Sequence, residues 1–428
     1  MLYHRFSQQI TASIFNRKTA LAPVAFLVAF GFLWQEAARA DTITDWNAIG
    51  NTAAVTNSGK PPAASAIDLA YMHAAIYDAV NAIDGRYSVF AVRLTGVPSG
   101  ASKEAAAAAA AYNVLKSLLP AQQAFLDSSY GVSLSTIPDG PAKADGIAVG
   151  EQVAIQFLAL RAGDGRNASI TYTPGTGPGA WQLTPPAFAA AQTPWIAQMR
   201  PFAIVSNSQF RADGPPSLDS NRWAKDFNET KSLGALNSTT RTAEQTEIGL
   251  FYTEHTGAQY ARIFRDFAQA QGMNLADNAR LFAVLYITLA DALIAGWDSK
   301  YHFGFWRPVT AIRAADTDGN ATTEADGSWS SLAATPNHPE YPSAHGVFTA
   351  AYAEALRRFF GTKRITITLT STVTGTSRTF HNTDDVIDEI IEARIYGGLH
   401  YRTSCVDGVA IGKKVARWIA KHYFRPVT

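Results

Sequence analysis

Two cations lie among aromatic residues in the segment "KYHFGFWRP", and their spacing suits a shared binding task. Lys300 and Arg307 are seven positions apart, which on a helix is about two turns and places both on one face. Pro308 disfavours helix at Arg307, so we expect the helix to end there with Arg307 beside Lys300. The alternative is a solvated helix end, but the aromatic residues between the two cations favour an apolar wall around them.

The segment "NHPEYPSAHG", residues 337–346, places a serine and two histidines at the start of a helix-forming run. Pro342 suits the first turn of a helix, which Ser343, Ala344 and His345 would continue. The N–H groups of a first turn lack partners and lie at the positive end of the helix dipole, so they can bind an anion. The alternative is that Ser343 only caps the helix.

The segment "EARIYGGLHYRTSCVDG" carries Arg394 and His400, which are six positions apart. An unbroken helix would place them roughly 120° from each other. Gly397 and Gly398 can end the helix and turn His400 back toward Arg394. The alternative is an ordinary basic helix C-terminus.

The three segments together predict an oxyanion site. Burying Lys300, Arg307 and Arg394 without carboxylates is costly, and a tightly bound tetrahedral or five-coordinate oxyanion would compensate the charge. His345 and His400 could then supply a nucleophile or covalent ligand and a general acid or base.

These segments resemble the three-part signature, K-x6-R-P, P-S-G-H and S-R-x5-H-x3-D, of the superfamily that joins vanadium-dependent haloperoxidases and type 2 phosphatidic acid phosphatases. The matching residues are Lys300-x6-Arg307-Pro308, Pro342-Ser343-Ala344-His345 and Ala393-Arg394-x5-His400. The resemblance covers about the last 110 residues and implies an all-α helical bundle of the haloperoxidase and acid phosphatase type.

The resemblance also implies roles for these residues. His400 would be bonded to vanadium, or would be the phosphoryl-accepting nucleophile of a phosphatase, and His345 would be the acid or base. The oxyanion would be held by Lys300, Arg307, Ser343, the Ala344 N–H and Arg394. A haloperoxidase would need vanadate, hydrogen peroxide and a halide, bromide or chloride, whereas an exported acid phosphatase would use the same residues on a phosphate ester without a metal. The context "FWRPVTAIR" and "HPEYPSAH" favours the haloperoxidase branch.

His338 falls where bromoperoxidases carry a histidine, so it would tune a proton or halide access. The alternative is a histidine on a surface loop.

Four residues after His400, the expected aspartate is replaced by Ser404. Asp407, Asp298 and Asp291 are candidates for the acid that orients His400, and Asp407 is the nearest in sequence. The missing acid also keeps open a non-catalytic oxyanion-binding protein.

Helical periodicity dominates the chain, so we expect an all-α fold with one minor β-hairpin in "RITITLTSTVTGTSRTF". We expect residues 41–428 to form a single large helical domain, with the oxyanion-binding core at about 240–428. The region from about Asp164 to Asp219 is rich in proline and glycine and should wrap over the surface. Its "GTGPGAW" is not a nucleotide loop, because no strand precedes it and no helix follows. His73 lies in an apolar helix and is expected to be a core histidine.

Composition and the N-terminal segment together indicate an exported, soluble protein. Only 17% of residues are charged and the formal net charge is +1, which gives no indication of a nucleic-acid or membrane-surface partner. Cys405 is the only cysteine, so an internal disulfide is excluded. Residues 1–40 resemble a secretory signal peptide with cleavage before Asp41, which predicts a periplasmic or secreted protein. The alternative is an uncleaved membrane anchor. No later segment is expected to span a membrane, and bundle relatives suggest a homodimer by analogy.

Overall fold

The computed structural model describes residues 41–427, and the predicted signal peptide, residues 1–40, lies outside them. Within the described residues, thirteen α-helices accompany one two-stranded sheet, which confirms the all-α prediction with a minor hairpin. The elements are α1 (Thr42–Asn51), α2 (Pro62–Asp84), α3 (Lys103–Leu118), α4 (Gln123–Ser135), α5 (Pro141–Leu160), α6 (Asn221–Leu233), α7 (Ala243–Phe251), α8 (Thr256–Gln271), α9 (Leu275–Phe303), α10 (Pro308–Arg313), α11 (Ala344–Phe360), β1 (Ile367–Thr370), β2 (Ser377–Phe380), α12 (Thr383–Tyr396) and α13 (Arg402–His422).

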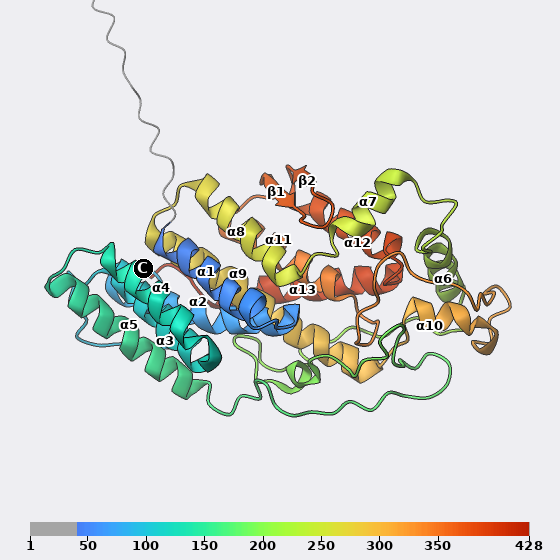
Figure 1. Cartoon of the computed structure of the whole chain (residues 1–428), viewed down its shortest axis with the longest axis horizontal. Helices are drawn as coiled ribbons and strands as arrows, with labels where there is room; N and C mark the ends of the chain where they lie inside the picture. Colours follow the sequence, from blue (N-terminus) through green and yellow to red (C-terminus); the bar gives the residue numbers. More distant parts are fainter. Residues whose placement is uncertain (1–40, 428) are drawn as a thin grey trace, which may run out of the picture. The chain divides into compact units, whose positions relative to one another are not determined.

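Two groups of helices build the core around α9. Helix α2 packs against α3, α5 and α9, while α11 packs against α9, α12 and α13. Figure 1 shows α2 to α5, coloured blue to teal, on one side, and α9, α11 and α13 extending from them toward α12. The predicted core histidine, His73 of α2, is fully buried and stacks on Tyr286 of α9.

Small residues let neighbouring helices approach closely. The seven consecutive alanines of α3 are all fully buried, and Ser102 caps the helix by accepting a hydrogen bond from Ala105 N at 3.1 Å. A Cβ added at Gly150 of α5 would lie 2.3 Å from Ala106 O, so α3 and α5 touch backbone to backbone. The alanine run therefore serves packing as well as helix propensity.

Helix α9 corrects one expectation from the sequence. Its length and mean hydropathy of 1.7 are sufficient to cross a membrane, contrary to the prediction that no later segment is apolar enough. However, 94% of its most apolar window is buried inside the protein, as expected for the central helix of a core. Asn274 caps its start, and Gly304, with φ of 55°, ends it.

The long irregular region is less superficial than predicted. Trp181 is fully buried, and its main-chain N–H donates to Gly304 O at 2.6 Å. Trp306 N donates in turn to Gly179 O at 2.9 Å. The "GTGPGAW" segment therefore fixes the chain where it leaves α9. The predicted hairpin is confirmed, with Ile367 paired to Phe380 and Thr370 to Ser377.

Candidate active site

The last turn of α9 and the start of α10 bring Lys300 and Arg307 into the core, where both are fully buried. Helix α9 ends at Phe303, four residues before the end at Arg307 that the sequence predicts, because Gly304 caps it. Arg307 therefore lies in extended backbone at the N-cap of a separate helix, α10, and Pro308 is the first residue of that helix. No carboxylate forms an ion pair with either side chain among the described residues. Burial lowers the pKa of Arg307 to about 9 and holds that of Lys300 well below its usual value.

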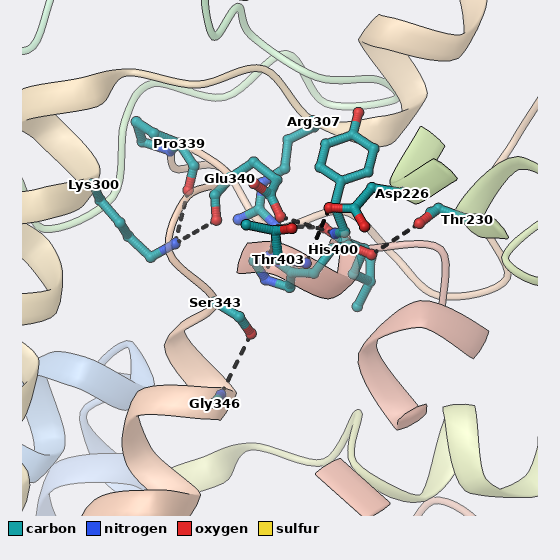
Figure 2. A network of polar contacts seen from close by, with 12 residues as sticks. Asp226, Thr230, Lys300, Arg307, Pro339, Glu340, Ser343, Gly346, His400 and Thr403 are labelled. Carbon is teal, nitrogen blue, oxygen red and sulfur yellow. Dashed lines mark hydrogen bonds and ion pairs between the residues drawn. The ribbon is translucent and has the colours of Figure 1, made fainter. Parts of the chain in front are cut away.

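Main-chain carbonyls of residues 338–340 receive both cations. Lys300 Nζ donates to Pro339 O at 2.9 Å and to Glu340 O at 3.0 Å, as Figure 2 shows. Arg307 Nε donates to His338 O at 2.8 Å, and its Nη1 donates to Leu399 O at 3.0 Å. This short segment of the second motif therefore holds the cations of the first motif in place.

The third motif turns as the glycines predict. Helix α12 ends at Tyr396, and Gly398 has φ of 70°. The chain then reverses, so His400 N lies 3.3 Å from Arg394 O. Both side chains are buried, with exposed fractions of 2% for Arg394 and 1% for His400.

Glu340, and not Asp407, is the acid that contacts His400. Its Oε1 lies 2.8 Å from His400 Nδ1 and accepts from Tyr401 N at 3.1 Å. Asp407 instead accepts from Tyr341 Oη at 2.6 Å, which corrects the prediction that it orients His400. The predicted role fails because Asp407 lies on α13, where its carboxylate meets the tyrosine of the second motif.

The other two candidate acids are also engaged elsewhere. Asp298 forms an ion pair with Arg211 at 2.6 Å. Asp291 is fully buried and accepts hydrogen bonds from the main-chain N–H groups of residues 202–204. Neither carboxylate is a described partner of His400.

Burial shifts the pKa values of Glu340 and His400 in opposite directions, whereas the charges of Arg307 and Lys300 lower both. Burial raises the pKa of Glu340 to about 7, although Arg307 and Lys300 favour its ionised form. Burial, followed by the charges of Arg307 and Lys300, holds the pKa of His400 well below its usual value. His400 is therefore neutral near pH 7, and one ring nitrogen keeps a lone pair.

Helix α11 begins at Ala344, two residues after the expected start at Pro342. Ser343 is its N-cap and accepts from Gly346 N at 3.4 Å, so Pro342 precedes the helix and does not start it (Figure 2). The extended backbone of Ser343 makes it the cap, which is the position that the alternative from the sequence gave it, and not a residue of the first turn. Among the described residues, no acceptor is found for the N–H of Ala344 or of His345.

His345 is partly exposed and is held by neutral groups. Its Nε2 lies 3.2 Å from Thr256 Oγ1, at the start of α8. Burial and the Arg394 charge hold the pKa of His345 well below its usual value, although the Tyr252 carbonyl favours the protonated ring. His345 is therefore neutral near pH 7, and one nitrogen of its ring keeps a lone pair.

His338 is buried, so the surface-loop alternative is wrong. Its exposed fraction is 6%, and its ring centroid lies 5.4 Å from that of Trp297. Arg307 Nη2 lies 2.9 Å from His338 Nδ1. Burial and the charges of Lys300 and Arg307 hold the pKa of His338 well below its usual value.

A cavity of about 100 Å³ brings the predicted residues together. Its walls include Trp297, His338, Ala344, His345, Arg394 and His400. Pockets for drug-sized ligands usually measure about 300–1,000 Å³, so this cavity suits a small anion and a small co-substrate. Lys300, Arg307 and Ser343 are adjacent to these residues without forming the cavity wall.

The N–H groups that lack acceptors among the described residues of this site fit an oxyanion. Arg394 uses only Nη1, which donates to Tyr252 O at 3.3 Å, and its buried Nε has no partner among the described residues. A guanidinium has five N–H groups, so four remain on Arg394. The ammonium of Lys300 makes two hydrogen bonds and keeps a third N–H.

Sequence reasoning missed Glu340 and Thr256. Glu340 lies inside the quoted segment "HPEYPSAH", between His338 and Ser343, so an acid beside the motif was visible. The search for the orienting acid followed His400 along the chain, whereas the fold supplies it from another segment. Thr256 lies at the start of a helix far from the motifs in sequence, so nothing in the pattern singled it out.

Comparisons with known proteins agree with the motifs. Residues 280–428 match the family model described as VCPO second helical-bundle domain. The vanadium chloroperoxidase of Curvularia inaequalis is 29% identical over 209 residues, which are 40% of this chain and 33% of that protein. The chain therefore spans about a third of the length of this curated relative.

Two solved structures resemble most of the chain. A bacterial vanadium-dependent iodoperoxidase is 25% identical, with a TM-score of 0.76 over 90% of this chain and 97% of its own. A bacterial vanadium-dependent chloroperoxidase in its holo form is 18% identical, with a TM-score of 0.67 over 86% of this chain and 93% of its own, and shares the fold. The resemblance to vanadium-dependent haloperoxidases indicated by the three motifs is confirmed.

Proposed function

We propose that this protein is a vanadium-dependent haloperoxidase, which oxidises bromide or chloride with hydrogen peroxide while vanadate is bound at His400. One observation carries the proposal: Arg394, with four unused N–H groups, and a neutral His400 line the same small buried cavity. A cationic cavity with an available imidazole lone pair suits an oxyanion that also forms a bond to nitrogen.

The residues around the cavity would divide the binding of vanadate between them. His400 would be the ligand, because the contact with Arg307 Nη1 at 3.2 Å places the lone pair of the neutral ring on Nε2. Arg307 would give up its place at this nitrogen to vanadate and would donate to an oxygen of the anion instead. Lys300, Arg307, Arg394, Ser343 and the Ala344 N–H would hold the oxygens. When bound, vanadate acts as a Lewis acid that activates hydrogen peroxide toward halide without changing its own oxidation state.

His345 would handle the proton of hydrogen peroxide. Its pKa is held well below the usual value, so the ring is neutral and can accept a proton. The Thr256 hydroxyl, 3.2 Å from Nε2, fixes the orientation of the ring. His338 and Trp297 form an apolar and aromatic wall that limits water, and His338 would tune halide access.

A paired assay tests this function. The purified mature protein, with and without added vanadate, is given bromide with hydrogen peroxide and, separately, an aryl phosphate. We expect bromination that requires vanadate and little hydrolysis, and we expect His400→Ala to abolish bromination. Hydrolysis that vanadate inhibits, without bromination, would contradict the proposal and support the acid phosphatase alternative.

The two alternatives have less support. A phosphatase would use the same cations and histidines, but the related proteins above are described as vanadium peroxidases. The non-catalytic alternative rested on the absent acid at position 404, and it loses support because Glu340 Oε1, from another segment, lies 2.8 Å from His400 Nδ1. Phosphate binding without either activity would favour the non-catalytic protein.

We also propose that residues 1–40 direct export, which makes the mature protein periplasmic or secreted, soluble and without a membrane anchor. Support comes from the signal-like sequence and from Asp41, whose Oδ1 accepts from Thr44 N at 2.9 Å and caps α1. A homodimer is proposed by analogy with helical-bundle relatives. The mass of the exported protein and its light scattering in solution test these points, and a retained N-terminus or a monomer would contradict them.

A further inference from the structure

We propose that Glu340 is the positioning residue of His400, which fixes the ring tautomer so that the lone pair is on Nε2, the nitrogen that faces Arg307. This inference rests on the proposed function for its catalytic consequence only. The role concerns the hydrogen bond and charge that Glu340 provides, because its carboxylate contacts His400 and does not line the cavity.

The hydrogen bonds of His400 determine its tautomer. Arg307 has only donors, so its Nη1, 3.2 Å from His400 Nε2, requires that Nε2 be an acceptor. In the neutral ring the proton must then lie on Nδ1, which is 2.8 Å from Glu340 Oε1. Oε1 is therefore the acceptor that completes the arrangement, and both ring nitrogens have defined roles.

Glu340 joins two segments of the site through different groups. Its main-chain carbonyl accepts from Lys300 Nζ at 3.0 Å, and its N–H donates to Phe305 O at 2.8 Å. Its side chain also accepts from Tyr401 N at 3.1 Å, beside His400. The residue thus couples the end of α9 to the turn between α12 and α13.

No other described carboxylate could take over this role in place. Glu340 is fully buried, and its ion pair with His400 is the only one recorded among the buried site residues. Ser404 lies beside the carboxylate of Glu340, and its hydroxyl favours the ionised form of that carboxylate. Ser404 occupies the position where the related signature has aspartate, so the acid has moved from α13 to the second motif.

The hydrogen bond and the charge can be separated experimentally. In Glu340→Gln the amide oxygen can still accept from Nδ1 and from Tyr401 N, but the negative charge beside the anion site is lost. We expect inorganic phosphate to bind this variant at least as tightly as wild type, while vanadate-dependent turnover falls about tenfold or more. A merely structural residue would not move affinity and turnover in opposite directions.

Glu340→Leu removes both the acceptor and the charge, so we expect phosphate affinity and turnover to fall by about tenfold to 100-fold each. Asp407→Asn is the matched control, because that acid contacts Tyr341 and not His400, and both quantities should stay near wild type. In the double variant Glu340→Ala with Ser404→Asp, an acid at position 404 should restore part of the turnover.

A measurement on the wild-type protein keeps the inference testable if variants fail to fold. Nitrogen-15 NMR of histidine-labelled protein should show His400 with its proton on Nδ1. A proton on Nε2, or equal losses in Asp407→Asn and Glu340→Gln, would overturn the inference. Phosphate affinity and the NMR tautomer do not depend on peroxidase activity, so absent bromination would reject the proposed function alone.

Discussion

Arg394 carries a buried charge that no carboxylate of the described residues balances, and burial lowers its pKa to about 10. Such a charge is costly in the free protein and useful once an anion binds. We therefore expect Arg394→Met to raise the free energy of unfolding without phosphate, while phosphate affinity falls at least tenfold. Charge-assisted hydrogen bonds contribute about 1.5–3 kcal/mol, which sets that scale. Urea unfolding and calorimetric titration with phosphate measure the two quantities.

Arg417→Met is the control for Arg394→Met. Arg417 pairs with Glu354 at 2.9 Å, and half of its side chain is exposed. Its removal should leave phosphate affinity unchanged. If Arg394→Met lowered stability and kept full affinity, the Arg394 charge would serve packing and not anion binding.

For single residues, the spacing within each motif was sufficient to predict four members of the site. Lys300, Arg307, Arg394 and His400 meet because each motif places them within one or two turns of a helix end. Glu340 could not be assigned to His400 in the same way, since 60 positions separate the two residues. Only the packing of α11 against α13 brings their segments together.

Helices α11 and α13 touch through glycines, and this contact carries the second and third motifs. A Cβ added at Gly412 would lie 2.3 Å from Val347 O and 2.7 Å from Ala351 N, both main-chain atoms. Gly412→Ala must therefore move the helices apart, and overpacking usually costs about 1–3 kcal/mol. We expect a lower urea midpoint and weaker phosphate binding, because Ser343 and His345 start α11.

Gly131→Ala is the matched control for that substitution. Gly131 lies in α4, and no heavy atom lies within 4 Å of an added Cβ. Alanine is favoured over glycine in a helix by about 1 kcal/mol, so this variant should be slightly more stable. Equal midpoints for Gly412→Ala and wild type would mean that the helices tolerate separation.

Helix existence was easier to predict than helix contacts. The long periodic runs of α9 and α11 have capping residues and glycine ends that the sequence displays. Helix α10 escaped notice because it has only 6 residues, too few for periodicity. The buried part of the irregular region also escaped notice, because the pairing of Trp181 with Gly304 joins segments distant in sequence.

Across the whole molecule, a buried polar cluster ties together the helices that enclose the core. His73 of α2 lies 3.0 Å from Asn47 Nδ2 of α1, and the same amide donates to Tyr286 Oη of α9 at 2.9 Å. Arg265 Nη1 of α8 donates to Asn47 Oδ1 at 2.9 Å. Four helices thus depend on a neutral His73, so its protonation affects the stability of the whole fold.

Burial lowers the pKa of His73 to about 3 from its usual 6.5. Below pH 6.5 the unfolded chain binds a proton that the folded protein excludes, so the fold loses stability as pH falls toward 3. The loss is about 1.4 kcal/mol per pH unit. His73→Phe removes this dependence on pH. The free energy of unfolding of the variant minus that of wild type should therefore rise by roughly 3 kcal/mol when the pH is lowered from 7.5 to 4.5. Urea unfolding at both pH values checks it, with exposed His302→Phe as control; an unchanged difference would show that His73 is protonated in the folded protein.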